Sequence, residues 1–518
     1  MQAIELELFR HLFTSIAEEM GIVLRKTSYS ANIKERRDYS CAVYDARGQT
    51  VAMGDHMPVH LGAMPLSVEA VRESFDLAPG DVALVNDPFR GGTHLPDITA
   101  VSPVFTRGSK RPAFYLANRA HHADVGGMSP GSMPLAREIF QEGLRIPPIL
   151  IQRAGKIDRP LLDLILSNVR TPVEREGDLM AQLMALHRGE LRLLELVAKF
   201  GEARVQRNMR ELEDYSERMM RAALRALPRG VYRFEDYLEG AATLHRIRVA
   251  VTLAGDRATV DFTGSSVQVD GPVNANLAVT TAATMYVFRC LVPEEIPFTA
   301  GILRPIEIVA PAGSIVNARP PAAMAAGNVE TSQRIADVIL GALAQAARLR
   351  IPAASCGTMN NLSFGGARTD GSAFAYYETI AGGMGASSEG AGHSATHTHM
   401  TNSWNTPVEA FEHQYPLRIE SYRVRPNSGG RGLYRGGDGI VREFRFLAPA
   451  EVTILSDRRV RGPYGLAGGK AGVTGRNTLL RAGRKPVELP AKTRFEIAAG
   501  DVLRIETPGG GGWGKAPA

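Results

Sequence analysis

Histidine and aspartate side chains with the spacing of metal ligands occur in the segment NDPFRGGTHLPDIT, residues 86–99. His94 and Asp97 form an HxxD pair there, within a loop whose backbone is constrained by Gly91, Gly92 and Pro96. Such a loop leaves the imidazole and the carboxylate free to project together. The pair is therefore the first candidate for a metal site.

A second group, His121, His122 and Asp124, follows about 20 residues later in ANRAHHADVGG. A strand between the two segments would bring the imidazoles of both to one place. Two imidazoles with one or two carboxylates suit Zn²⁺, Mn²⁺ or Fe²⁺, and Asp38 and Glu35 are the nearest upstream carboxylates that can complete the shell. We therefore predict one divalent metal. The alternative, that these histidines cap turns and bond to the backbone, remains open on spacing alone.

Two further polar clusters are candidates for substrate contact. His397 and His399 lie in GHSATHTHMTN, where alternation places them on one face of a strand. Metal ligation and a purely structural role are the alternatives for this pair. Asn328 and Glu330 open a predicted helix in AAGNVETSQR, where helix capping is the alternative. We expect these four side chains to contact the substrate.

Motifs for other kinds of catalysis are missing from the sequence. It contains no GxxxxGK[ST] phosphate loop and no GxSxG nucleophile elbow. Its three cysteines, Cys41, Cys290 and Cys356, lie too far apart for a thiolate metal motif, and their odd number argues against a disulfide framework. Metal-assisted chemistry is thus the leading enzymatic interpretation, and we do not expect this chain to bind ATP.

The composition is that of an ordinary folded protein. Of 518 residues, 44% are hydrophobic and 22% are charged, and this length exceeds what a single core usually serves. The net charge of +6 comes without a dense basic stripe, which argues against nucleic-acid binding. No uncharged apolar run of about 18 residues occurs, and the N-terminus lacks the pattern of a secretory signal. We therefore expect a cytoplasmic protein that does not span a membrane.

The helices and strands expected around these residues indicate an α+β fold with several subdomains and mixed sheets. An amphipathic helix over 4–24 precedes a hairpin over 38–53. Short strands follow around 82–86, 98–105 and 113–118. The predicted regions are an N-terminal α+β region with the metal site (1–158), a helical segment (159–230), a central α+β region (231–415) and a C-terminal Gly-rich β region (416–518).

Eight segments together resemble the hydantoinase B family, in the same order and along nearly the whole chain. They are NIKERRDYSCAVYD, MPVHLGAMP, NDPFRGGTHLPDIT, ANRAHHADVGG, GNVETSQR, HMTNSWNTPVE, SGGRGLYRGGDG and TPGGGGWG. The family includes B subunits of N-methylhydantoinase and 5-oxoprolinase, caprolactamase-like enzymes and subunits of acetone and acetophenone carboxylases. The resemblance implies a divalent metal at His94, Asp97 and His121, completed by Asp38 or Glu35. It leaves open which of His121 and His122 faces inward.

The resemblance also implies a partner. A hydantoinase A-type subunit would bind ATP and Mg²⁺ and phosphorylate the amide or ketone oxygen, and this chain would process the product as part of a heterotetramer or larger assembly. The favoured reaction is hydrolysis of a small cyclic amide, with Asp124 as general base and His122 steadying the oxyanion. The alternatives are a subunit of a ketone carboxylase and a non-catalytic scaffold for the A-type subunit.

Overall fold

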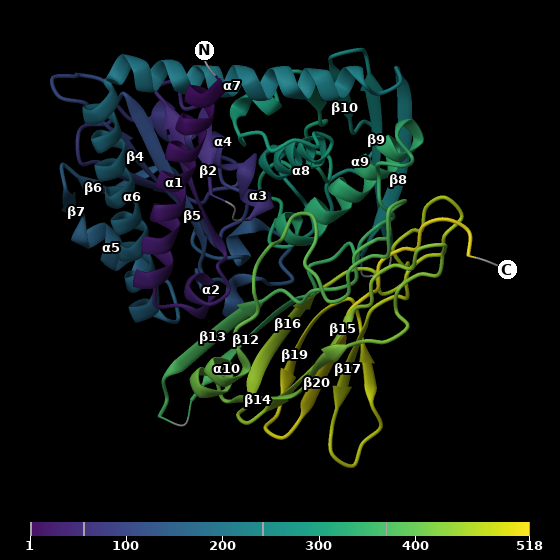
Figure 1. Cartoon of the computed structure of the whole chain (residues 1–518). Helices are drawn as coiled ribbons and strands as arrows, with labels where there is room; N and C mark the ends of the chain where they lie inside the picture. Colours follow the sequence, from purple (N-terminus) through teal and green to yellow (C-terminus); the bar gives the residue numbers. More distant parts are fainter. Residues whose placement is uncertain (1–2, 55–56, 241–242, 369, 517–518) are drawn as a thin grey trace.

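The structure, a computed structural model, describes residues 3–54, 57–240, 243–368 and 370–516. Its strands form four sheets, and long helices cover or connect them (Figure 1). The chain is thus a mixed α/β structure built from several sheets, as the sequence predicted. Three large hydrophobic clusters correspond to an N-terminal, a central and a C-terminal part.

The N-terminal part is a seven-stranded sheet of order β2-β1-β5-β4-β3-β6-β7. Its strands are β1 (Tyr39–Asp45), β2 (Thr50–Met53), β3 (Val82–Val85), β4 (Asp97–Val104), β5 (Phe114–His121), β6 (Ile149–Arg153) and β7 (Lys156–Ile157). The central strands β4 and β5 are fully buried. This burial is possible because helices lie on both faces of the sheet.

Helices α1 (Ala3–Thr27) and α6 (Pro172–Phe200) cover one face of this sheet, and α4 (Met64–Ser74) covers the other. Apolar residues of α1 recur three or four positions apart, so Phe9, Phe13 and Met20 point into the same core. Short helices α2 (Ala31–Lys34), α3 (Pro58–Leu61) and α5 (Arg159–Leu166) complete this part.

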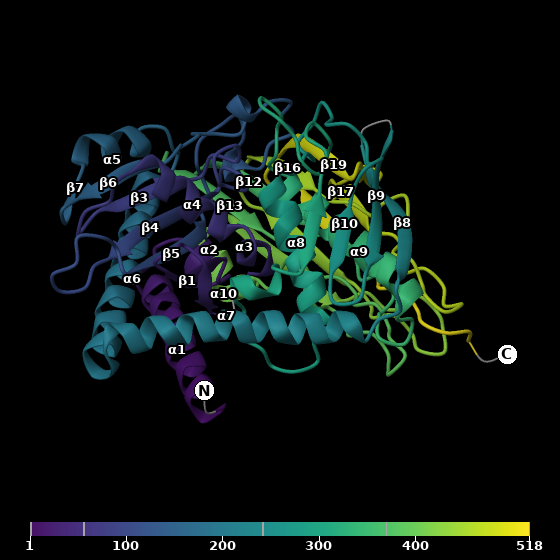
Figure 2. The same cartoon turned by 90° about the horizontal axis from the view of Figure 1, so that it is seen from above.

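Helix α7 (Glu202–Arg225) bridges the N-terminal and central parts along one side of the molecule (Figure 2). Its first half contributes Met209 and Leu212 to the N-terminal core, whereas its second half contributes Met220 and Leu224 to the central one. The helices of segment 159–230 are therefore shared between two cores, because α6 and the first half of α7 pack in the N-terminal core and the second half of α7 packs in the central one.

The central part has a sheet of order β11-β10-β9-β8 with two helices packed against it. The elements are β8 (Gly230–Glu239), β9 (Leu244–Leu253), β10 (Ala258–Asp261), β11 (Ile306–Val309), α8 (Leu277–Cys290) and α9 (Ser332–Ala346). A π-helical turn, η4 (Gly327–Thr331), leads directly into α9. This turn matters for the site, because π turns redirect side chains that a regular helix would place elsewhere.

The C-terminal part consists of two sheets around an aromatic core. One has the order β13-β12-β16-β19 and the other the order β14-β15-β20-β17-β18. The elements are β12 (Asn361–Ala367), β13 (Ala373–Glu378), α10 (Val408–Gln414), β14 (Leu417–Val424), β15 (Ile440–Phe446), β16 (Ala450–Leu455), β17 (Arg476–Leu480), β18 (Val487–Leu489), β19 (Lys492–Ile497) and β20 (Val502–Glu506). Because β12 pairs with β16, this part begins well before the predicted boundary at 415.

Glycines outside these strands pack backbone against backbone in what we call the glycine seam, formed by residues 382–392, 429–437, 465–472 and 509–512. A methyl group on Gly436 would lie 2.1 Å from the carbonyl oxygen of Gly510. The amide of Gly430 donates to the same oxygen at 2.8 Å, and that of Gly510 donates to Gly437 at 2.9 Å. Glycine is required here because no side chain fits between the segments.

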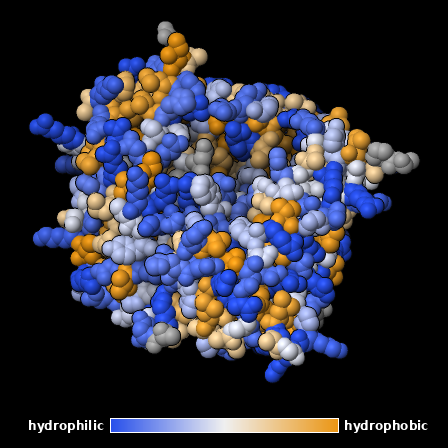
Figure 3. Space-filling view, turned by 60° about the horizontal axis from the view of Figure 1, so that its bottom comes forward, coloured by the Kyte–Doolittle hydropathy of each residue, from blue (hydrophilic) through white to orange (hydrophobic). Residues whose placement is uncertain are grey.

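The surface seen in Figure 3 intersperses hydrophilic and hydrophobic residues and is hollowed near its upper centre. No helix in the described residues is both long enough and apolar enough to cross a bilayer.

Candidate metal centre

The loop before β4 holds His94 and Asp97 in position. Gly91 has a φ of 94°, and a methyl group on Gly92 would lie 2.2 Å from the carbonyl oxygen of Asn86. The side chain of Asn86 fixes the loop further by donating to the carbonyl of Leu95 at 2.8 Å. The two glycines therefore allow a tight path that brings His94 back over the start of the strand.

Strand register brings His121 to the same place. In the antiparallel pair of β4 and β5, Asp97 lies directly opposite His121. Oδ1 of Asp97 is 3.1 Å from Nε2 of His94 and 3.3 Å from Nδ1 of His121. All three side chains are buried, and their candidate ligand atoms lie within 4.8 Å of one another.

These three residues could hold a divalent cation, because each offers a ligand atom close to those of the other two. Nδ1 of His94 lies 3.2 Å from the carbonyl of Ala325 and donates to it, which leaves Nε2 with its lone pair. Among the described residues, neither that atom nor Oδ1 of Asp97 nor Nε2 of His121 has a hydrogen-bond partner of proper geometry. Buried polar atoms are rarely left so, and a cation would satisfy them.

The second oxygen of Asp97 is held by three side chains. Oδ2 accepts hydrogen bonds from Thr93 Oγ1 at 2.9 Å and from Asn328 Nδ2 at 3.2 Å, and Nε2 of His60 lies 3.4 Å away. His60 in turn contacts Ser40 through Nδ1 at 3.0 Å. One residue of the same loop and two from distant segments thus orient one carboxylate, as is usual around metal ligands.

Burial and charge act against each other in this group. Burial disfavours the charged imidazole of His94, but the carboxylate of Asp97 outweighs it and raises the pKa of His94. Burial also opposes ionisation of Asp97, yet His94 and His60 hold its pKa well below the usual range. Burial lowers the pKa of His121. A carboxylate beside a neutral imidazole is the state that binds a cation, and a proton on His94 competes with it.

The two candidate upstream carboxylates are placed differently. Asp38 is buried, and its main-chain carbonyl accepts from the amide of His121 at 3.0 Å. Glu35 ends the short helix α2 and is half-buried. Neither belongs to the three-ligand group found among the described residues.

His122 and Asp124 point away from the group. Nε2 of His122 lies 3.0 Å from Oε1 of Gln182 on α6. The carboxylate of Asp124 accepts from the backbone amide and the guanidinium of Arg170 and from the amide of Gly126. The structure therefore does not bring these two side chains to His94, Asp97 and His121, because alternate residues after β5 face opposite sides.

The four candidate substrate-contacting residues are also separated. Asn328 reaches the metal group through Asp97, whereas Glu330 accepts from the amide of Met359 at 3.0 Å and from Asn361 Nδ2 at 2.7 Å in a buried network. His397 and His399 line a different cavity, whose wall also includes the first residue of helix α3.

Two residues near the group were not singled out in the sequence. His60 lies within the segment MPVHLGAMP, and this segment is the sequence feature that could have identified it. No sequence feature could have identified Glu142. Its Oε1 accepts hydrogen bonds from the amides of Met324 and Ala325, while its buried Oε2 has no partner among the residues described. Burial raises the pKa of Glu142 to about 7.

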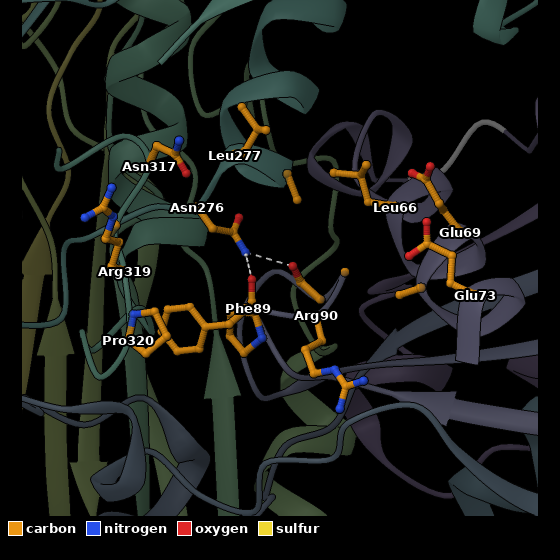
Figure 4. A pocket seen from close by; sticks show the side chains of 16 residues that line it. Leu66, Glu69, Glu73, Phe89, Arg90, Asn276, Leu277, Asn317, Arg319 and Pro320 are labelled. Carbon is orange, nitrogen blue, oxygen red and sulfur yellow. Dashed lines mark hydrogen bonds between the residues drawn. The ribbon is translucent and has the colours of Figure 1, made fainter. Parts of the chain in front are cut away.

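A cavity of about 630 Å³ lies beside the loop that leads into the metal group. Figure 4 shows Asn276 at its wall, where its amide donates to the carbonyls of Pro88 and Gly92 at 2.7 and 2.8 Å. Arg90 and Arg319 lie around the same space. None of the three candidate ligands is among the described residues that line it.

The family model for hydantoinase B/oxoprolinase matches residues 2–516. The chain belongs to this family. A curated family member, 5-oxoprolinase 1 of Arabidopsis thaliana, is 40% identical over 99% of this chain but 42% of its own length. The B component of a putative D-/L-hydantoinase of Pseudomonas sp. (strain NS671) is 33% identical over 97% of this chain and 88% of its own. The chain thus spans about two fifths of the oxoprolinase.

Solved structures of similar fold agree with this membership of the hydantoinase B/oxoprolinase family. The ATP-dependent caprolactamase from Pseudomonas jessenii matches with a TM-score of 0.93 at 28% identity, over 100% of this chain and 92% of that one. A nucleotide-free acetone carboxylase matches with a TM-score of 0.90 at 19% identity, over 99% and 76%. The second likeness concerns the fold alone.

Proposed function

We propose that this chain is the metal-binding subunit of an ATP-dependent enzyme that hydrolyses a cyclic amide. The observation that carries the proposal is the buried group of His94, Asp97 and His121, whose candidate ligand atoms lie within 4.8 Å of one another in the described structure. The family supports it, because relatives are named as a 5-oxoprolinase, a hydantoinase component and a caprolactamase.

In this proposal the work is divided between two subunits. A partner of the hydantoinase A type binds ATP and Mg²⁺ and transfers a phosphoryl group to the amide oxygen, which makes the ring carbon electrophilic. Water then adds to that carbon in this chain and the ring C–N bond breaks, which leaves a free amine and an acyl phosphate. A second water hydrolyses the acyl phosphate to a carboxylate and inorganic phosphate. A divalent cation at His94, Asp97 and His121 would supply a water of lowered pKa for this attack.

The surrounding residues have distinct tasks. Thr93, Asn328 and His60 keep one oxygen of Asp97 occupied, so the other stays directed at the two imidazoles. We assign the acceptance of the water proton to Glu142, because its Oε2 is buried without a partner in the described residues and its pKa is near neutrality. Asp38 is favoured over Glu35 to complete the ligand set because it is buried next to His121.

The partner would dock partly on the helices of segment 159–227. Helix α6 supports this proposal, because its large apolar side chains Val173, Met184 and Leu191 are 73%, 52% and 43% exposed and are available to pack against a partner. Size-exclusion chromatography of the co-expressed subunits should show equal stoichiometry in a heterotetramer or larger complex. A chain that hydrolyses an amide as a monomer would refute the division of labour.

The function is tested by co-expression with the A-type subunit and an ATP-hydrolysis screen over hydantoins, 5-oxoproline and lactams. Asp97→Ala should lose both metal and turnover, and Glu142→Gln should keep the metal but lose turnover by roughly 10²- to 10⁴-fold. The exposed His413→Ala on α10, outside the proposed docking surface, is the matched control and should change neither. Turnover of a ketone with bicarbonate would instead indicate a carboxylase. Absence of metal from wild-type chain challenged with Mn²⁺ or Zn²⁺ would indicate a scaffold.

A further inference from the structure

A second cavity, of about 390 Å³, lies between helix α8, Leu340 of α9, the segment 350–355 and residues 397–402. We call it the histidine-lined cavity because His397 and His399 form part of its wall. Much of the remaining wall is hydrocarbon, contributed by the following side chains: Pro58, Val287, Leu291, Leu340, Ile351, Pro352 and Met384. A space of this volume and character suits a small ring compound.

Two short connections join this cavity to the metal group. Pro58 in its wall is two positions from His60, and both belong to α3. On the opposite side, Nε2 of Gln333 donates to the carbonyl of Thr398 at 3.1 Å, and Gln333 follows the π turn that carries Asn328. Helix α3 therefore carries a residue beside Asp97 and also lines the cavity, and the π turn leads into α9, whose Leu340 lines it too.

The wall around His399 is polar and strained. Nδ1 of His399 lies 3.4 Å from the hydroxyl of Tyr286, and its Nε2 lies 3.9 Å from Oδ1 of Asp337. The other oxygen of Asp337 is fixed by Arg458 at 2.7 Å. His399 has a φ of 55°, a conformation that costs energy for a residue with a side chain and is concentrated at functional sites.

Among the described residues that line the cavity, Arg350 alone carries a formal charge at neutral pH. It is exposed, and one of its guanidinium nitrogens donates to the carbonyl of Leu291. An arginine beside a hydrocarbon wall matches a ligand that has an apolar ring and one anionic group, since guanidinium pairs strongly with carboxylate and phosphate.

We propose that the histidine-lined cavity binds a small ring compound with one anionic group, its ring against the hydrocarbon wall and its anion at Arg350. The choice of a cyclic amide as the ring rests on the proposed function. The anion has two possible sources, a carboxylate on the ring or the phosphoryl group added by the partner. Arg350 is then a specificity-determining residue outside the metal group.

Cys290 provides a direct readout, because it lines the cavity and is exposed, whereas Cys41 and Cys356 are buried. Alkylation of Cys290 in the full-length chain, followed by mass spectrometry, reports whether the cavity is filled. The probes are 5-oxoproline, pyrrolidin-2-one (the same ring without the carboxylate) and inorganic phosphate. The protecting concentration of each gives its affinity without partner, ATP or turnover.

We expect 5-oxoproline to protect Cys290 at concentrations roughly 10- to 100-fold lower than pyrrolidin-2-one, as one charge-assisted hydrogen bond would give. Arg350→Gln should abolish this difference, while Arg348→Gln, an exposed arginine two positions away that does not line the cavity, should keep it. Protection by phosphate that also needs Arg350 would identify the phosphoryl group as a source of the anion.

Equal protection by the two rings, or discrimination that survives Arg350→Gln, would overturn the proposal. Circular dichroism of each variant guards against misfolding, and Cys290→Ser confirms the site of alkylation. The proposed function fails separately: a chain that shows Arg350-dependent protection but holds no metal would keep the cavity assignment and lose the hydrolase.

Discussion

The side-chain amide of Asn328 donates a hydrogen bond to Oδ2 of Asp97 at 3.2 Å. This bond links the π turn before α9 to the first residue of β4, so the central part of the protein directly orients a candidate ligand of the N-terminal part. The geometry of the candidate metal centre therefore depends on how the N-terminal and central parts pack against each other.

Asn328→Ala should weaken binding of Mn²⁺ or Zn²⁺ by roughly 10- to 100-fold, because the freed carboxylate can rotate away from the imidazoles. Chelator-competition titration measures the affinity. Gln414→Ala, at an exposed amide on α10, is the control and should bind as wild type. An unchanged affinity in Asn328→Ala would show that Asn328 does not position Asp97.

The neighbouring histidines His121 and His122 should respond differently to substitution. His121→Ala should remove most of the metal, since Nδ1 of His121 lies 3.3 Å from Asp97. His122→Ala should retain it but lower the free energy of unfolding by about 1–3 kcal/mol, because Oε1 of Gln182 loses its buried partner. Elemental analysis and urea unfolding measure the two effects. If His122→Ala lost the metal and His121→Ala kept it, His122 would be the ligand and His121 the structural residue.

Glu330 makes stability depend on pH. Burial raises the pKa of Glu330 from 4.5, its value in the unfolded chain, to about 8 in the folded protein. The folded state therefore gains stability from holding this proton. That contribution is fully present below pH 4.5 and is lost as pH rises through 8. Glu330→Gln keeps a neutral side chain at all pH values. Relative to wild type, the variant should gain on the order of 3 kcal/mol between pH 5 and pH 8.

Urea unfolding followed by circular dichroism at pH 5, 6.5 and 8 measures this gain. The control is Glu409→Gln at an exposed position of α10, whose difference from wild type should not change with pH. A constant difference for Glu330→Gln as well would mean that the buried carboxyl is ionised in the folded protein.

The isolated chain should neither bind nor hydrolyse ATP, because its sequence contains no GxxxxGK[ST] phosphate loop. Calorimetry with ATP and Mg²⁺ should give no heat of binding, whereas the co-purified complex should bind ATP. Tight binding to this chain alone would contradict the proposed division of labour.

Patterns among neighbouring residues predicted the elements and contacts that form within a short stretch of chain. The periodicity of 4–24 predicted α1, and the hairpin at 38–53 is confirmed as β1 and β2. The convergence of HxxD with the first histidine of HHAD followed from one strand pairing, in which Asp97 faces His121. These features required no knowledge of how distant segments pack.

Long-range packing decided what the sequence could not predict. Glu142 reaches the site because it accepts from the backbone of Met324 and Ala325, far along the chain, and no spacing of residues signals such a contact. The pairing of β12 with β16 likewise joins segments separated by many other elements. Composition along the chain carries no signal of such a pairing.

The glycine seam also limits how this protein can change over evolutionary time. In an ordinary core, a residue that gains a methylene can be compensated by a neighbour that loses one. Across the seam, Gly383, Gly436 and Gly469 each face a backbone carbonyl within 2.1 Å of where a methyl group would lie, and no substitution can shorten a backbone. A second mutation therefore cannot compensate for a substitution at these positions. Selection for folding must retain each of these glycines independently.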